Sequence, residues 1–185
     1  MKRLIPIMMA FCLATVAQAQ SITKARFILS RDYNSFRAIE LELNNQYLVG
    51  ISSDGDLEYF ETLTGDELFE GDCEGQGIPI KYYTTFDIHD IPGRLKSIDN
   101  IKISYNNTFD IHDVKGTLKS IGNIPIKYYN TFDIHDPKGK VKSVGNVSIK
   151  YFNIFDTNRK FGEIKSIAGN SSRVAVIRGR RYNWD

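Results

Sequence analysis

Three short motifs of aspartate and histidine contain the residues whose types could bind a metal. The sequence Asp-x-His-Asp occurs three times at a spacing of 23 residues and includes all three histidines of the chain. Imidazole and carboxylate groups are zinc ligands, so one hypothesis is a metal site, and with it a hydrolytic function. Its candidate ligands are Asp87, His89, Asp90, Asp110, His112, Asp113, Asp133, His135 and Asp136.

The alternative interpretation is that each motif is a surface turn, in which aspartate hydrogen-bonds the backbone and histidine is exposed. A metal shared between motifs needs donor atoms only a few ångströms apart, whereas one motif alone offers three ligands within four residues, which is cramped for a tetrahedral ion. The corresponding fourth segment reads Asp156-Thr157-Asn158-Arg159, so the fold does not require the motif. We therefore predict no cofactor.

A second candidate site is a mixture of lysine and tyrosine on the polar face of the predicted strands. Such a surface can bind an anionic glycan, a lipid head group or an acidic protein. Alternatively, the lysines only keep the sheet solvated and prevent aggregation. The candidate residues are Lys81, Tyr83, Lys96, Lys119, Lys127, Tyr129, Lys142 and Lys150, with Lys165 and Phe152 at equivalent places.

Sequence motifs of common enzyme classes are missing. The chain contains no Gly-x-Ser-x-Gly, His-Glu-x-x-His or phosphate-binding loop. After removal of the predicted leader described below, Cys73 is the only cysteine left, and it has no predicted histidine partner. We predict that the protein is not an enzyme.

The elements that position these residues belong to a unit of 23 residues written four times. The copies are 78–100, 101–123, 124–146 and 147–170, the last one residue longer. Phenylalanine recurs at Phe86, Phe109, Phe132 and Phe155, and glycine at Gly93, Gly116, Gly139 and Gly162. A strict period of this length is typical of repeat proteins, in which each unit buries its apolar face against its neighbours.

Each unit is predicted to contain two strands joined by a turn. In the third copy, period-two alternation places Ile124, Ile126, Tyr128 and Phe132 on one side. For the connection between copies, a two-residue turn would set Lys119 opposite Ile126 on the apolar face. We therefore predict a three-residue connection with a bulge.

Two all-β architectures fit this period. An antiparallel meander of hairpins separates equivalent residues by about 10 Å along one elongated sheet, whereas a β-solenoid stacks them about 4.8 Å apart. In a solenoid the repeated aspartates would stack on one another, and so would the repeated lysines, so that like charges repel. At the wider spacing of the meander most of this repulsion is screened. We favour the meander and keep the solenoid as the alternative.

The repeat region also resembles a known family. The pattern Lys127-Tyr128-Tyr129, followed by Gly139-Lys140-Val141-Lys142-Ser143-Val144-Gly145, is similar to MORN-type hairpin repeats, especially the YwqK-like variant. The resemblance covers 78–170 only, and an Asp-Ile-His-Asp turn stands where that family usually has glycine-containing positions. It implies β-hairpins in an elongated sheet and a binding or scaffolding function, with no enzymatic activity.

The remaining segments complete the predicted organisation. Residues 1–19 have the layout of a signal peptide: Lys2 and Arg3, an apolar stretch, then Ala17-Gln18-Ala19 before the cut. In residues 20–77, strand signals alternate with turn signals, which predicts two hairpins or a four-strand meander. The segment ends in an acidic loop. Residues 171–185 form a final strand, Arg173–Arg178, and a basic tail. We expect an exported protein of bacterial type in the periplasm, at the cell surface or in the medium.

The charge distribution suggests further partners. Residues 20–77 hold 4 Lys/Arg against 12 Asp/Glu, and 78–170 hold 14 against 9. Blocks of opposite sign favour head-to-tail self-association, although two solvated surfaces of different composition would look the same. We predict an unknown protein, glycan or envelope component as partner and no nucleic acid. The chain is not expected to be an integral membrane protein, because its apolar stretch is short. Three functions therefore remain open: a binding or scaffold module, a metal-binding protein and a self-assembling structural protein.

Overall fold

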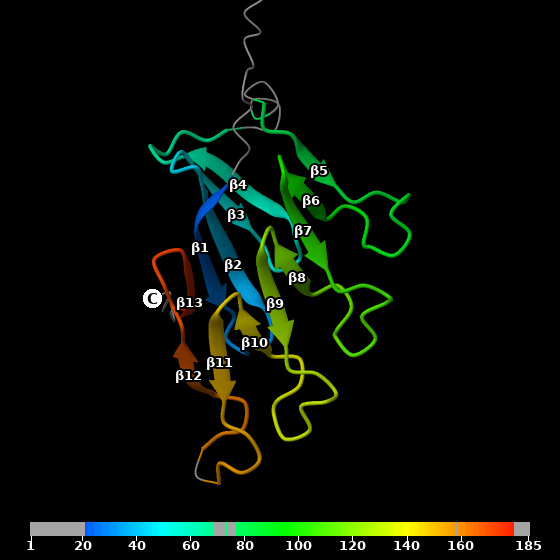
Figure 1. Cartoon of the computed structure of the whole chain (residues 1–185), viewed down its shortest axis with the longest axis vertical. Helices are drawn as coiled ribbons and strands as arrows, with labels where there is room; N and C mark the ends of the chain where they lie inside the picture. The colour runs from blue at the N-terminus through cyan, green and yellow to red at the C-terminus, as the bar shows by residue number, and fades with distance from the viewer. Residues whose placement is uncertain (1–20, 69–72, 74–76, 158, 180–185) are drawn as a thin grey trace, which may run out of the picture.

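The computed structural model describes residues 21–68, 73, 77–157 and 159–179, and thirteen strands make up two sheets (Figure 1). The predicted signal peptide, most of the acidic loop and the end of the basic tail lie outside these residues. No helix in the described ranges is long and apolar enough to cross a membrane.

The first sheet has five strands in the order β13-β1-β2-β3-β4. Its N-terminal part is the predicted four-strand meander, and β13 joins it by pairing parallel with β1. The strands are β1 (Ile22–Leu29), β2 (Phe36–Leu43), β3 (Tyr47–Ile51), β4 (Leu57–Thr62) and β13 (Val174–Arg178).

The second sheet contains the repeats, in the order β12-β11-β10-β9-β8-β7-β6-β5, so each strand pairs with its neighbours along the chain. All of these pairs are antiparallel, which confirms the all-β meander of repeated hairpins and excludes the solenoid. The strands are β5 (Ile80–Tyr82), β6 (Leu95–Ile98), β7 (Ile101–Tyr105), β8 (Leu118–Ile121), β9 (Ile124–Tyr128), β10 (Val141–Val144), β11 (Val147–Tyr151) and β12 (Ile164–Ala168).

The predicted connection between repeats is wrong. Ile121 pairs with Ile124, so only Gly122 and Asn123 connect β8 to β9. The bulge lies inside the hairpin instead: Tyr105 pairs with Leu118 and Ser104 with Ser120, and Lys119 is the extra residue. Strict alternation therefore fails in the second strand of the repeat. The two apolar residues of β8, Leu118 and Ile121, therefore both face the core although they lie three positions apart. Lys119 faces outward without the free-energy cost of a buried charge.

One hydrophobic cluster includes buried side chains from both sheets. In β9 and β11 the first, third and fifth residues are buried and the two between are exposed, as expected for strands with one face in a core. The sheets also meet through the backbone, where the Leu95 amide donates to the Gly55 carbonyl at 2.9 Å. Cys73 is fully buried in this cluster, which fits a small core side chain better than an intermolecular disulfide.

Candidate functional site: a ridge of apolar loop tips

Four loops of the same construction project along one edge of the repeat sheet (Figure 1). They span 83–94, 106–117, 129–140 and 152–163, between the two strands of each repeat. In the third repeat the Gly139 amide donates to the Tyr129 carbonyl at 2.7 Å, and the Tyr129 amide donates to the Lys140 carbonyl at 2.9 Å. Gly139 has φ 81°, a conformation that favours glycine, which explains the glycine repeated at this position. The other three loops close with the same pair of bonds.

An aspartate organises each loop from within. Asp133 accepts a hydrogen bond from the Asn130 amide at 3.0 Å through Oδ2, and Oδ1 lies 2.6 Å from Lys142 Nζ. The Asn130 side chain in turn accepts from the Phe132 amide at 3.1 Å. Asp87, Asp110 and Asp156 make the corresponding ion pairs with Lys96, Lys119 and Lys165. The first aspartate of each predicted metal motif is therefore bound to backbone and to a lysine.

These contacts lower the pKa of all four aspartates. For Asp87 and Asp156 the lysine hydrogen bond is the largest cause, followed by the backbone amide. For Asp110 and Asp133 burial acts in the opposite direction, but the lysine hydrogen bond, the backbone amide and the lysine charge together outweigh it, so the pKa still falls. The carboxylates are charged structural groups.

The histidines join neighbouring loops. His89 lies against the Phe109 ring with centroids 4.4 Å apart, and His112 lies against Phe132 at 4.3 Å. His112 Nδ1 is also 3.1 Å from Thr131 Oγ1 in the next loop. His135 and Phe155 repeat the ring contact at 4.7 Å. Each histidine therefore stacks one loop on the next, and rings of phenylalanine and histidine alternate along the edge.

The structure does not bring the nine predicted metal ligands together. Among the described residues, no three His, Cys, Asp or Glu side chains form a group that could hold an ion. The histidines contact phenylalanine, the first aspartates contact lysine, and Asp90 and Asp136 lie 3.4 and 3.3 Å from Asn107 and Asn153 of the next loop. The motif builds each loop as a surface turn, which the turn interpretation predicted, and it also joins each loop to the next, which that interpretation did not foresee.

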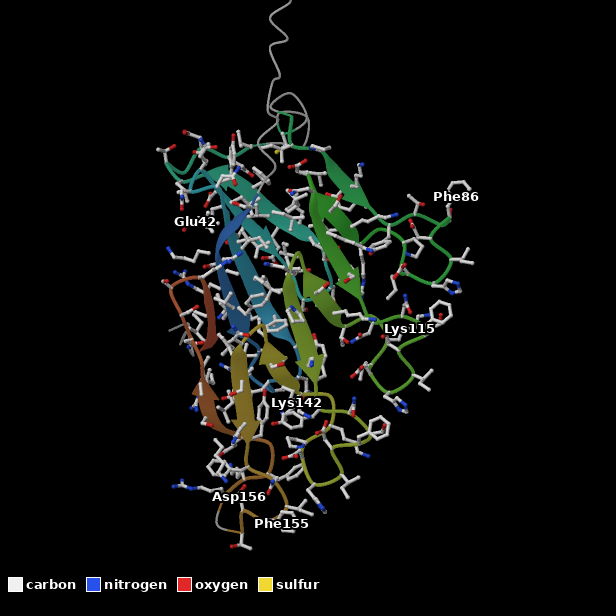
Figure 2. The ribbon with its side chains drawn as sticks, in the orientation of Figure 1. Glu42, Phe86, Lys115, Lys142, Phe155 and Asp156 are labelled. Atoms are coloured by element: carbon white, nitrogen blue, oxygen red, sulfur yellow. The ribbon has the colours of Figure 1, made fainter. Side chains whose placement is uncertain are left out.

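The loop tips carry large apolar side chains that point into solvent. Phe86 is 91% exposed and Ile88 80%, and the same two positions are exposed in the next two repeats. Figure 2 shows Phe86 directed away from both sheets, and Phe155 at the tip of the last loop. We define the loop ridge as Phe86, Ile88, Phe109, Ile111, Phe132, Ile134 and Phe155.

The sequence pattern did not predict this ridge. It placed Phe132 on the core side by extending the alternation of β9, but Phe132 is 71% exposed. The strand ends at Tyr128, and Asn130 begins a hydrogen-bonded turn directly after it. An asparagine two residues before the phenylalanine, followed by Asp133, is the turn signal that could have ended the predicted strand.

The predicted lysine and tyrosine face is only partly available. Tyr83 and Tyr129 are buried, and their hydroxyls donate to the Ile103 and Ile149 carbonyls, each at 3.0 Å. Burial raises the pKa of Tyr83 to about 12, with smaller contributions from Asp90 and Asp87. Lys96, Lys119 and Lys142 are the partners of the loop aspartates. Only Lys81, Lys127 and Lys150 of the predicted set are exposed strand residues outside these ion pairs.

Comparison of the chain with protein-family models, with curated proteins and with solved structures gives no match in any of the three. The resemblance to MORN-type repeats therefore stays a prediction.

Proposed function

We propose that the chain is a non-enzymatic binding and scaffold protein, and that the loop ridge is its contact surface. The observation that carries this proposal is the exposure of Phe86, Phe109, Phe132 and Phe155, at 91, 70, 71 and 67%. Contiguous exposed apolar patches larger than a few hundred Å² mark interaction sites in soluble proteins. The fold does not need these rings outside, because the loops are held by their backbone bonds and aspartates.

The partner that fits the ridge best is a second copy of the chain. Two antiparallel strands separate successive loops, so the phenylalanines recur at about 10 Å, twice the distance between neighbouring strands. A second ridge has the same period by construction, so its rings can pack against those of the first in register. A two-fold interface of this kind is the commonest arrangement in homo-oligomers.

Charges favour the antiparallel orientation of two ridges. In the first loop, Lys96 balances Asp87, which leaves Asp90 as the net charge of the tip, while Arg94 lies at the base of the loop. In the last loop, Lys165 balances Asp156, which leaves Arg159 and Lys160 at the tip and Glu163 at the base. At the tips of the middle loops one aspartate and one lysine remain, and Lys140 adds a positive charge at the base of the third loop. Antiparallel pairing sets the basic last loop of one copy against the acidic first loop of the other, twice in each dimer.

The ridge is also large enough. Four phenylalanines and three isoleucines, each mostly exposed, present on the order of 800 Å² of apolar surface, which is about what each partner contributes to a stable interface. Val114 and Phe161, exposed at 57 and 56%, extend the surface on its flanks.

The test is the mass of the protein in solution, measured by sedimentation as a function of concentration. The wild type is expected to be a dimer, and a variant with serine in place of Phe86, Phe109, Phe132 and Phe155 a monomer. Its melting temperature should fall only slightly, because these rings lie outside the core and their loss removes only the contacts with His89, His112 and His135. The matched control replaces the exposed strand lysines Lys81, Lys127 and Lys150 with serine and should remain dimeric. A monomeric wild type, or a quadruple variant that dimerises as well as the wild type, would refute the proposal.

Orientation is tested by reversing charge. Arg159→Glu with Lys160→Glu should weaken an antiparallel dimer, because two acidic loops then face each other, and adding Asp90→Lys should restore it. In a parallel dimer the last loops face each other, so Asp90→Lys would give no rescue.

The cellular location of the protein is part of the same proposal. We propose that the protein is exported, with residues 1–19 as its signal peptide, and that the assembled ridge serves as a scaffold in the periplasm, at the cell surface or outside the cell. The binding and scaffolding role implied by the resemblance to MORN-type repeats agrees with this function.

A further inference from the structure

The sixth position of the repeat holds an aromatic ring in three copies and asparagine in one. The residues are Tyr83, Asn106, Tyr129 and Phe152. In the first and third copies, the tyrosine ring lies over the beginning of the next repeat, and its hydroxyl donates to the carbonyl of that repeat's third residue, Ile103 or Ile149, at 3.0 Å.

Each of these two rings has the same surroundings. Tyr83 meets the Tyr105 ring edge-on, with centroids 6.0 Å apart and planes at 73°, and Tyr129 meets Tyr151 at 5.7 Å and 80°. A lysine ammonium lies over each ring at 5.1 Å, from Lys96 in the first copy and Lys142 in the third. Carbonyl, tyrosine edge and lysine together form a standard setting for a phenol ring in this fold.

The second copy keeps this setting but has no ring of its own. Its Asn106 is only 4% exposed, and its Nδ2 donates to Thr117 Oγ1 at 2.8 Å, within its own loop. The asparagine is therefore engaged inside the loop, and its short side chain does not cover the next repeat.

A pocket of about 450 Å³ opens where the ring would lie, a volume in the range of small-molecule sites. Lys119, Ile126 and Tyr128 line it, and these are the same repeat positions as Lys96, Ile103 and Tyr105 around Tyr83. Asn106, Lys127 and Lys142 also contribute to the wall. The pocket is thus lined by the same lysine, isoleucine and tyrosine positions that surround a phenol ring in the neighbouring repeats.

We infer that this pocket binds a phenol ring, from a small phenol or from a tyrosine side chain of another protein. The bound ring takes the place that Tyr83 and Tyr129 occupy in their repeats. Its hydroxyl donates to the Ile126 carbonyl, its face lies below the Lys119 ammonium, and it meets Tyr128 edge-on. Binding is non-covalent, and it does not depend on the loop ridge, which lies at the loop tips.

The experiment is a titration of the full chain with 4-methylphenol, followed by NMR, with toluene as the matched ligand that lacks the hydroxyl. We expect a dissociation constant on the order of 1 mM for such a small ligand. Toluene should bind about 3–10-fold more weakly, because it forgoes one hydrogen bond. Nuclear Overhauser contacts from the bound ring to Tyr128 and Ile126 locate the site without any variant.

Substitutions at Asn106 make the test specific. Asn106→Tyr supplies the ring from within the chain and should abolish binding of 4-methylphenol while raising the melting temperature. Asn106→Ala leaves the pocket open and should still bind. Binding by Asn106→Tyr equal to that of the wild type, ring contacts elsewhere on the protein, or no binding of 4-methylphenol at several millimolar would each overturn the inference.

Two further ligands distinguish the source of the ring. A short peptide containing tyrosine should bind more tightly than the same peptide with phenylalanine if the pocket receives a protein side chain. If only the free phenol binds and the peptide does not, the site is for a small molecule.

Discussion

Lys142 Nζ lies 2.6 Å from Asp133 Oδ1, and this ion pair joins the bulge of one strand to the turn of the loop before it. Lys142 is the extra residue of the bulge in β10, so the bulge directs it outward toward the loop. Asp133 also accepts the Asn130 amide. The same arrangement occurs in all four repeats, at 2.6 to 2.8 Å. The irregularity in the strand therefore contributes to the construction of the loop.

Asp133→Asn should lower the free energy of unfolding by about 0.5–1 kcal/mol, because the amide keeps one acceptor but loses the charge that faces Lys142. The measurement is urea unfolding followed by circular dichroism. Asp113→Asn is the matched control, since Asp113 belongs to none of the six ion pairs found in the described part of the chain. An equal loss of unfolding free energy in both variants would show that the overall charge of the protein, rather than the Asp133–Lys142 pair, accounts for the effect.

Acid should weaken the fold through the four loop aspartates. Their pKa values are lowered below the ordinary 3.8 in the folded chain. A lowered pKa means that the unfolded chain binds protons more readily, so this stabilisation is complete above about pH 4 and is lost as pH falls through the folded pKa values. The melting temperature should therefore fall steeply below about pH 4 and less steeply in a variant with asparagine at Asp87, Asp110, Asp133 and Asp156. Equal slopes in the two proteins would contradict this assignment.

The hairpin meander could be predicted because the period of the repeat and the positions of its charges both restrict the possible architectures. Stacked copies of Asp133 and Lys142 would have repelled their neighbours in a solenoid, and that argument needs no knowledge of side-chain contacts. The bulge could not be predicted in the same way. In Leu118-Lys119-Ser120-Ile121, the two apolar residues are three apart, and a bulge in the strand or in the connection serves equally well until the pairing is known.

The site was harder to predict than the fold. Aspartate and histidine are residue types shared by metal sites and by loop construction, so type and spacing alone do not separate the two. The decisive facts are contacts between repeats, such as His112 on Phe132, which depend on how closely neighbouring loops approach. Exposure of Phe132 follows from the position at which β9 ends, and strand ends are poorly defined by hydrophobic alternation.

Chelation should leave the protein unchanged. Purified protein is expected to contain no stoichiometric zinc or calcium, and its melting temperature should be the same with and without EDTA, because Lys119 engages Asp110 and the next loop engages His112. Replacing His89, His112 and His135 with alanine should lower the melting temperature slightly through loss of the ring contacts, equally with and without EDTA. One bound ion per chain that is lost in the triple variant would restore the metal hypothesis.

The connection between repeats contains a residue in the left-handed conformation. Gly145 has φ 53°, and a Cβ built on it would lie 3.6 Å from the nearest side-chain atom, Ile124 Cγ2, so space is sufficient and only the backbone conformation is unfavourable. Gly145→Ala should therefore destabilise the protein by about 1–2 kcal/mol, the cost of the left-handed conformation for an ordinary residue. Asp99 has φ 49° at the same place in the first repeat. Because aspartate tolerates this conformation better than alanine, Gly145→Asp should destabilise less. Urea unfolding of the two variants checks the order, and a larger loss for aspartate than for alanine would mean that contacts of the side chain, rather than the backbone, determine the residue at this turn.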